Sequence, residues 1–135
     1  MTVIALTRTA RVEIVESIEQ RTLVASEAIT PGAPVRIGTD GKFTNGNGTT
    51  TTEADVYGIA TGDRIVPAGM ALTALARGTL DGFTFAGDPN ALIYVSDTDG
   101  SLDTAAGTVS KVVGKIVPGT AGVLGSTAKL LRVML

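Results

Sequence analysis

The sequence contains neither histidine nor cysteine among its 135 residues. It therefore lacks the side chain most often used as a general base near neutral pH, the common zinc ligands and the most reactive nucleophile. Without cysteine there is no disulfide framework, and the cellular compartment stays open on this evidence. Most hydrolase and zinc-enzyme mechanisms are excluded. A carboxylate pair of the glycosidase type is the remaining catalytic alternative, but the sequence marks out no two acidic residues for it.

Concentrated charge and long apolar runs are also missing. The 11 basic and 13 acidic residues nearly cancel, and neither sign gathers into a run of the kind that binds nucleic acid or an anionic membrane. No segment approaches the roughly 20 apolar residues that span a bilayer, and the stretch from Met1 to Arg8 lacks the basic start of a secretion signal. We expect a soluble protein with no nucleic-acid partner and no membrane partner.

Aromatic residues make up only 4% of the chain, so Val, Ile, Leu and Ala must fill most of its core. Short apolar runs recur between turn residues, and the length suits one domain. The runs are Thr22 to Ala25, Val35 to Ile37, Val56 to Ala60, Ala71 to Ala76, Ala91 to Ser96, Val109 to Val117 and Lys129 to Met134. This spacing predicts an all-β fold, a small β-barrel or sandwich-like domain with Gly-rich turns and little helix.

Seventeen glycines leave few windows in which a helix fits. A short helix is compatible with Ala121 to Ser126 or with the first 25 residues. The segment from Arg11 to Ile18 has both strand and helix periodicity, and we interpret it as a strand. Asp40-Gly41 and Asp99-Gly100 are typical of hairpin tips. The polar stretch from Asn45 to Thr52 predicts a mobile surface loop rather than a core element.

The most suggestive cluster of polar residues runs from Asp97 to Asp103, with the sequence Asp-Thr-Asp-Gly-Ser-Leu-Asp. Oxygen ligands at alternate positions around a tight glycine turn suit a Ca²⁺ ion. The segment lacks a bidentate Glu and is shorter than an EF-hand loop. The alternative is a hairpin turn in which Asp97 and Asp99 bind nearby backbone amides and Gly100 takes a positive φ. The alternative is favoured, and no metal ligand is assigned.

Two further motifs carry weaker signals. Gly46-Asn-Gly48 is the nearest approach to a phosphate-binding loop, but no helix pattern follows it, which favours a plain loop. Lys111 has an apolar setting unlike the displayed lysine of biotinyl and lipoyl domains, which favours an outward-facing strand residue. We therefore assign no catalytic, cofactor-binding or metal-binding residue. Few charges interrupt Leu72 to Ala76 or Val123 to Leu131, so these segments are either association surfaces or simply core.

The order of several short Gly-containing phrases resembles that of the capsid decoration, or cement, proteins of tailed bacteriophages. The phrases are Ala28 to Val35, Asp40-Gly41, Val56 to Ala60, Gly69 to Gly78, Tyr94 to Leu102 and Val113 to Ile116, and the resemblance covers about residues 22 to 135. It implies a small closed β-barrel decoration domain that forms a homotrimer and binds the major capsid protein. It also implies a place on the outer capsid surface of the virion, after synthesis in the host cytoplasm, with no cofactor.

The first 21 residues fall outside that resemblance. We expect them to form an N-terminal arm or an extra strand, and we hypothesise that Thr2 to Glu19 reaches a neighbouring subunit. The alternative function is a receptor- or glycan-binding β-domain of a phage fibre. Glycan sites usually offer aromatic stacking, and Tyr57, Tyr94 and three Phe residues are all that the chain has.

Overall fold

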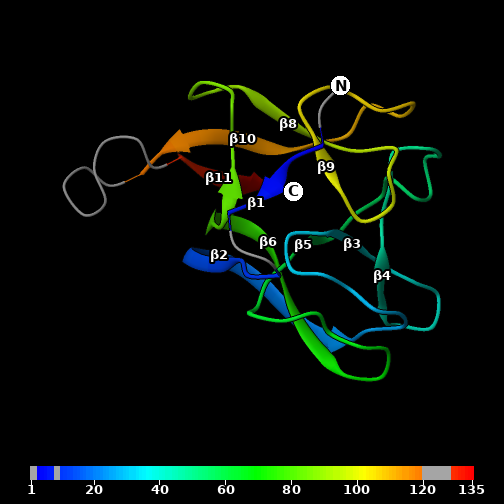
Figure 1. The fold of residues 1–135 in the computed structure, drawn as a ribbon. Helices are drawn as coiled ribbons and strands as arrows, with labels where there is room; N and C mark the ends of the chain where they lie inside the picture. Colours follow the sequence, from blue (N-terminus) through cyan, green and yellow to red (C-terminus); the bar gives the residue numbers. More distant parts are fainter. Residues whose placement is uncertain (1–2, 8–9, 120–128) are drawn as a thin grey trace.

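The computed structural model describes residues 3–7, 10–119 and 129–135. In these residues there is no helix, and the strands form a curled antiparallel half-barrel (Figure 1). The prediction of an all-β, barrel-like domain is confirmed. The described part of the first 25 residues holds strands where a short helix was compatible, whereas residues 121–126 lie outside the description. Among the described residues, no helix is long and apolar enough to cross a membrane.

Eight strands follow one another across the large sheet in the order β4-β3-β5-β6-β11-β10-β8-β9, and β2 joins this sheet by pairing with β6. β1 and β7 form a separate two-stranded ribbon. The strands are β1 (Ala5–Leu6), β2 (Glu13–Val24), β3 (Pro34–Ile37), β4 (Phe43–Asn45), β5 (Gly58–Ala60), β6 (Ala71–Asp81), β7 (Phe83–Thr84), β8 (Leu92–Val95), β9 (Leu102–Asp103), β10 (Val112–Pro118) and β11 (Lys129–Met134).

Each predicted apolar run contains or overlaps a strand, but β6 continues past Ala76 to Asp81. The extension passes through Gly78, whose φ is +142° and where an added Cβ would lie 2.1 Å from the backbone oxygen of Glu16. Only glycine lets β2 and β6 approach so closely at this point. The result is a long β2–β6 pair, to which β5 and β11 are attached along the other edge of β6.

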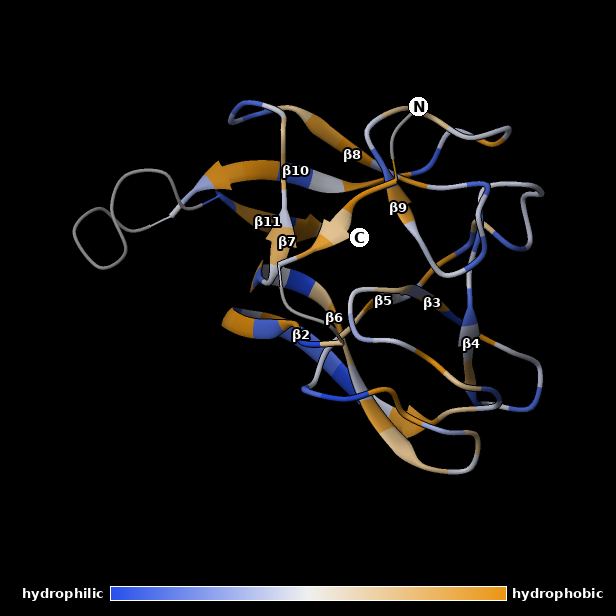
Figure 2. Ribbon diagram, viewed as in Figure 1, coloured by the Kyte–Doolittle hydropathy of each residue, from blue (hydrophilic) through white to orange (hydrophobic). Residues whose placement is uncertain are grey.

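The core consists of two clusters of mainly aliphatic side chains. The larger lies among β6, β8, β10, β11 and the β1–β7 ribbon, and the smaller lies among β3, β4 and the start of β6. Figure 2 shows β8 as apolar and long stretches of β2 as hydrophilic. Leu72, Ala74, Leu75 and Ala76 are all buried, so the interpretation of this run as an association surface is wrong and the core interpretation is correct. Residues 123–128 of the other proposed surface lie outside the description.

The described residues of the N-terminal segment pack on the rest of their own chain. β1 pairs with β7, Val12 is buried in the larger cluster, and β2 pairs with β6 along its whole length. β2 runs without a break from residue 13 to residue 24, across the expected boundary between residues 21 and 22.

Candidate association surface

Two polar segments that the sequence singles out, one after β4 and one between β8 and β9, lie against each other. The Gly48 amide donates to the Ser96 carbonyl oxygen at 2.8 Å, and the Gly100 amide donates to the Gly46 carbonyl oxygen at 2.9 Å. The Asn47 side-chain amide donates to Asp99 Oδ1 at 3.0 Å. These bonds join the two ends of the curled sheet, and we call residues 46–48 together with 96–100 the seam.

The seam corrects the prediction of a surface loop at residues 45–52. Gly46 and Gly48 are buried, and only residues 49–52 are exposed throughout. An added Cβ at Gly48 would lie 3.0 Å from Asp97 Oδ1 and 3.1 Å from the Val95 carbonyl oxygen, so the close approach of the two segments favours glycine. The Gly46-Asn-Gly48 motif therefore has a structural role in joining two ends of the sheet.

The acidic residues of the 97–103 segment point to separate partners. Asp97 accepts bonds from the backbone amide and the hydroxyl of Thr108, each at 2.9 Å. Asp99 accepts from Asn47, and Asp103 accepts from the Ala105 amide at 3.1 Å. No group of three or more potential metal-ligating side chains occurs in the part of the chain that the structure describes. Gly100 has a φ of +69°, as the hairpin alternative expects, but Asp97 and Asp99 bind distant segments instead of nearby amides.

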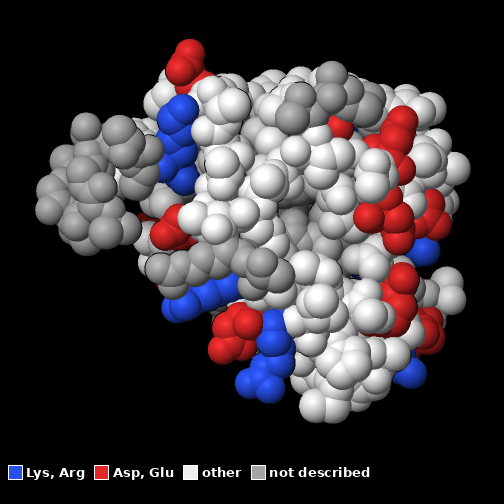
Figure 3. All heavy atoms as spheres, viewed as in Figure 1, with Lys and Arg blue, Asp and Glu red and all other residues white. Residues whose placement is uncertain are grey.

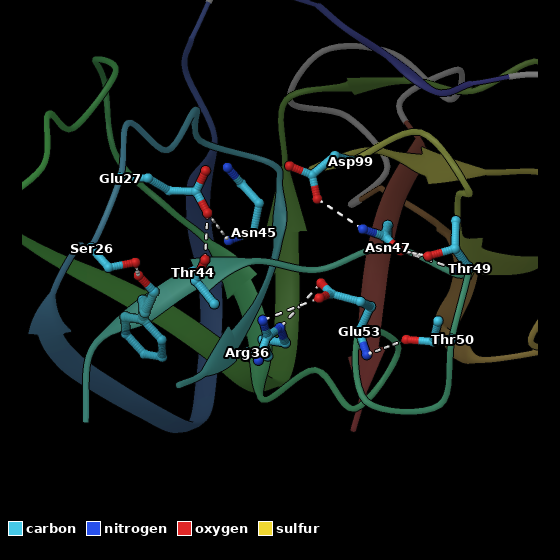
Figure 4. A network of polar contacts seen from close by, with 11 residues as sticks. Ser26, Glu27, Arg36, Thr44, Asn45, Asn47, Thr49, Thr50, Glu53 and Asp99 are labelled. Atoms are coloured by element: carbon cyan, nitrogen blue, oxygen red, sulfur yellow. Dashed lines mark hydrogen bonds and ion pairs between the residues drawn. The ribbon is translucent and has the colours of Figure 1, made fainter. Parts of the chain in front are cut away.

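A second polar network borders the seam (Figure 4). Thr44 donates its hydroxyl to Glu27, and the Asn45 amide donates to the same carboxylate oxygen at 3.3 Å. The Thr44 hydroxyl, and after it the Asn45 amide, lower the pKa of the Glu27 carboxyl below its ordinary value despite a smaller opposing effect of burial. Arg36 and Glu53 form a two-pronged ion pair at 3.3 Å beside this network. The network fastens the turn before β3 to β4.

A shallow, open depression of about 370 Å³ lies beside residues 51–55. Thr51, Thr52, Ala54, Asp55, Val109 and Lys111 line it. Lys111 is half-buried and lies one residue before β10, so it borders a strand instead of lying within one as predicted. None of the lining residues is aromatic, so the depression lacks the stacking surface that a sugar ring prefers.

Across the sheet, the register aligns side chains of five strands in rows. One row lies in the core, with Leu80, Leu131 and Ile116 buried and Ile14 partly buried against them. The neighbouring row projects from the opposite face and consists of Glu16, Thr79, Arg132, Lys115 and Leu92. Directly paired residues share a face of the sheet, so this second row forms a continuous outer strip.

Lys115 and Arg132 are direct cross-strand partners on this strip. Like charges in this position repel, and neither cation forms an ion pair with any residue that the structure describes. Leu92 and Met134 are exposed on the same face, and Leu130 and Val117 are half-buried there. We call these six residues the basic sheet face. It combines uncompensated positive charge with accessible apolar area.

β2 is an edge strand that is exposed over most of its length, because among the described strands it pairs only with β6. Its register with β6 shifts at three points, and at two of these Val15 and Ile18 have no partner on β6. These side chains are 56% and 61% exposed, and Glu16 and Glu19 are exposed beside them. A bulge re-aims side chains away from the regular pleat. We call Val15, Glu16, Ile18 and Glu19 the acidic edge.

A third exposed feature lies at the far end of the β2–β6 pair. Residues 65–71 have the uncharged sequence Ile-Val-Pro-Ala-Gly-Met-Ala, with Ile65 51% and Met70 57% exposed. Backbone bonds at 2.8 Å, from Ala25 to Met70 and from Gly69 to Ala25, hold this loop in place. Figure 3 shows no Lys, Arg, Asp or Glu on the lower tip of the face that it draws. We call residues 65–71, with the neighbouring Val24, the apolar tip.

Comparison of the sequence with known proteins identifies no relative. No model of a known protein family matches the chain, and no curated protein matches it.

Proposed function

We propose that the protein is a structural component of a phage virion that binds the outer surface of the capsid as a homotrimer and stabilises the shell. The observation that carries this proposal is the apolar tip. It is an ordered, uncharged loop whose large side chains face solvent, and such a loop suits a protein contact better than a free surface. The order of Gly-containing phrases in the sequence supports the same role.

The proposed role requires binding alone, so it needs no catalytic group and no cofactor. A protein that binds the assembled lattice but not the loose subunit stabilises the lattice by mass action. Several weak contacts in one oligomer add up through multivalency, so each contact can be small. In this proposal the apolar tip contacts the major capsid protein, while the half-barrel holds the tip in position.

No contact among residues 3–7, 10–119 and 129–135 favours the alternative of a glycan-binding fibre domain. The shallow depression beside residues 51–55 has no aromatic lining residue. Of the two tyrosines, Tyr57 packs against Phe43 with ring centroids 5.9 Å apart, and the Arg21 guanidinium lies 5.9 Å from the Tyr57 ring centroid. One face of this ring is thus occupied within the chain.

Co-sedimentation with expanded capsids tests the proposal. The purified protein is mixed with capsids that lack decoration, and the pelleted amount is measured against the amount added. We expect saturation at a fixed ratio of protein to capsid subunit, together with increased resistance of the shell to heat. A protein that stays in the supernatant at every concentration would overturn the proposed function. Unassembled capsid protein serves as the control, because binding to it must be weaker.

A further inference from the structure

We infer that copies of the chain bind one another through two unlike patches, with the acidic edge of one copy docking on the basic sheet face of the next. This inference deepens the proposed function, because it names the surface through which a homo-oligomer forms. Its partner is a second copy of the same chain, and its evidence lies in the charges, the apolar residues and the register of the large sheet.

Charge provides the first step of the argument. Lys115 and Arg132 face each other across neighbouring strands and have no carboxylate partner among the described residues. A carboxylate from another molecule would relieve their repulsion and gain an ion pair that is partly shielded from water. Glu16, which is exposed and has no ion-pair partner among the described residues, is such a carboxylate.

The pairing is not formed within one copy. Glu16 and Arg132 lie in the same row but on opposite sides of β6, with Thr79 between them. Two strand spacings separate them by about 10 Å. The basic residues of β10 and β11 thus lie apart from Glu13, Glu16 and Glu19 of β2, although β2 also carries Arg21 and β6 carries Arg77 opposite Glu19. This arrangement leaves each patch with a complement on the neighbouring copy.

Apolar residues accompany both patches. Val15 and Ile18 flank Glu16 on the acidic edge, and Leu92 and Met134 are exposed on the basic sheet face. A specific interface combines an apolar core with polar and charged residues at its rim, because the apolar area supplies affinity and the charges fix the register. A phosphate or a polyanion would match the cations but not these side chains.

Since the two patches differ, each copy has one of each and can use both. Contacts between unlike patches close into a ring when the rotation between copies allows it. A trimer is one such ring, and it would cover the exposed β2 strand and the basic sheet face of every copy. The apolar tip, at the far end of the β2–β6 pair, belongs to neither patch and is left for another partner.

The test is the mass of the purified full chain in solution, measured by light scattering over a range of concentrations. We expect an oligomer whose dissociation constant rises about tenfold or more in Arg132→Glu and in Glu16→Lys, because each replaces an attraction with a repulsion. The double variant R132E/E16K restores the attraction between copies, and its dissociation constant should return to within a few-fold of the wild-type value. Raising the salt concentration should weaken the wild-type oligomer.

Lys42→Glu is the matched control, because Lys42 is exposed in the β3–β4 turn and forms no ion pair with a described residue. Its mass should equal that of the wild type, and circular dichroism should show all variants folded. A wild-type protein that is monomeric at every concentration overturns the inference, as does a double variant as weak as the single ones. Capsid pelleting separates the two proposals. A monomer that still pellets overturns this interface alone, and an oligomer of the expected kind that does not pellet overturns the capsid function alone.

Discussion

The Asn47 side chain donates a hydrogen bond to Asp99 across 3.0 Å, and the two residues are 52 positions apart in the sequence. β4 and β9, the two ends of the strand order, do not pair with each other. The hydrogen bonds of the seam connect these two ends of the curled sheet instead of strand pairing. The polar residues that most resemble a binding motif in the sequence are therefore used to hold the fold.

Replacing Asn47 with alanine removes the bond to Asp99 and the acceptor of the Thr49 amide. We expect a loss of about 1 kcal/mol in the free energy of unfolding, which is typical of a single hydrogen-bonded side chain. Hydrogen exchange should also become faster at the Gly48 and Gly100 amides, which donate across the seam. Thr51→Ala, at an exposed position outside the seam, is the control. Unchanged exchange at both amides would contradict the role of Asn47.

Gly100 and Gly41 provide a matched pair of Asp-Gly turns. Both have a positive φ, +69° at Gly100 and +77° at Gly41. A Cβ added at Gly100 would lie 2.9 Å from Asn45 Oδ1, whereas a Cβ added at Gly41 would have no heavy atom within 4 Å. Gly41→Ala should cost roughly 1–2 kcal/mol from backbone strain alone. Gly100→Ala should cost more, because Asn45 must also move. Chemical denaturation of both variants gives the difference, and equal costs would argue against tight packing at the seam.

The lowered pKa of Glu27 makes part of the stability depend on pH. Because the folded pKa lies below the unfolded value, the contribution is present above about pH 4.5 and is lost as the pH falls through the folded pKa. At pH 7 we expect Glu27→Gln to unfold more easily than the wild type, by less than about 1 kcal/mol because the group is largely exposed. The difference should disappear in acid.

Thr44→Val isolates the cause of this effect, since the Thr44 hydroxyl contributes most to lowering the pKa of Glu27. Without that hydroxyl, NMR titration should show the pKa of Glu27 closer to its ordinary value. A stability difference between wild type and Glu27→Gln that stays constant from pH 7 to pH 3 would refute the assignment.

The apolar tip allows a direct test of capsid contact. Met70→Ser should weaken capsid binding at least about tenfold, because losing a buried methionine contact costs roughly 1.5–3 kcal/mol. It should leave thermal stability nearly unchanged, since Met70 is 57% exposed. Ile37→Ser, at an exposed apolar position outside the tip, is the matched control and should bind normally. Equal binding of both variants would place the contact elsewhere.

The sequence predicts the strands well because their apolar runs and Asp-Gly turns act locally. The turn at Gly41 is an example, since the Gly38 amide bonds the Lys42 carbonyl oxygen and closes the β3–β4 hairpin as expected. The seam was not predictable, because it depends on a contact between segments far apart in the chain. The basic sheet face could not be predicted from the sequence either, since Lys115 and Arg132 become neighbours only through the register of β10 and β11.

The bulges on β2 make this edge strand less able to pair with the edge strand of another molecule and form fibrils. A straight edge strand of this length would be a template for the stacking of further strands into fibrils. The unpaired Val15 and Ile18 distort the edge, and Glu13, Glu16 and Glu19 repel a second identical edge placed in parallel register. Deleting Val15 would remove one bulge and straighten part of β2. The bulges and the glutamates of this strand thus oppose the edge-to-edge stacking of copies into fibrils.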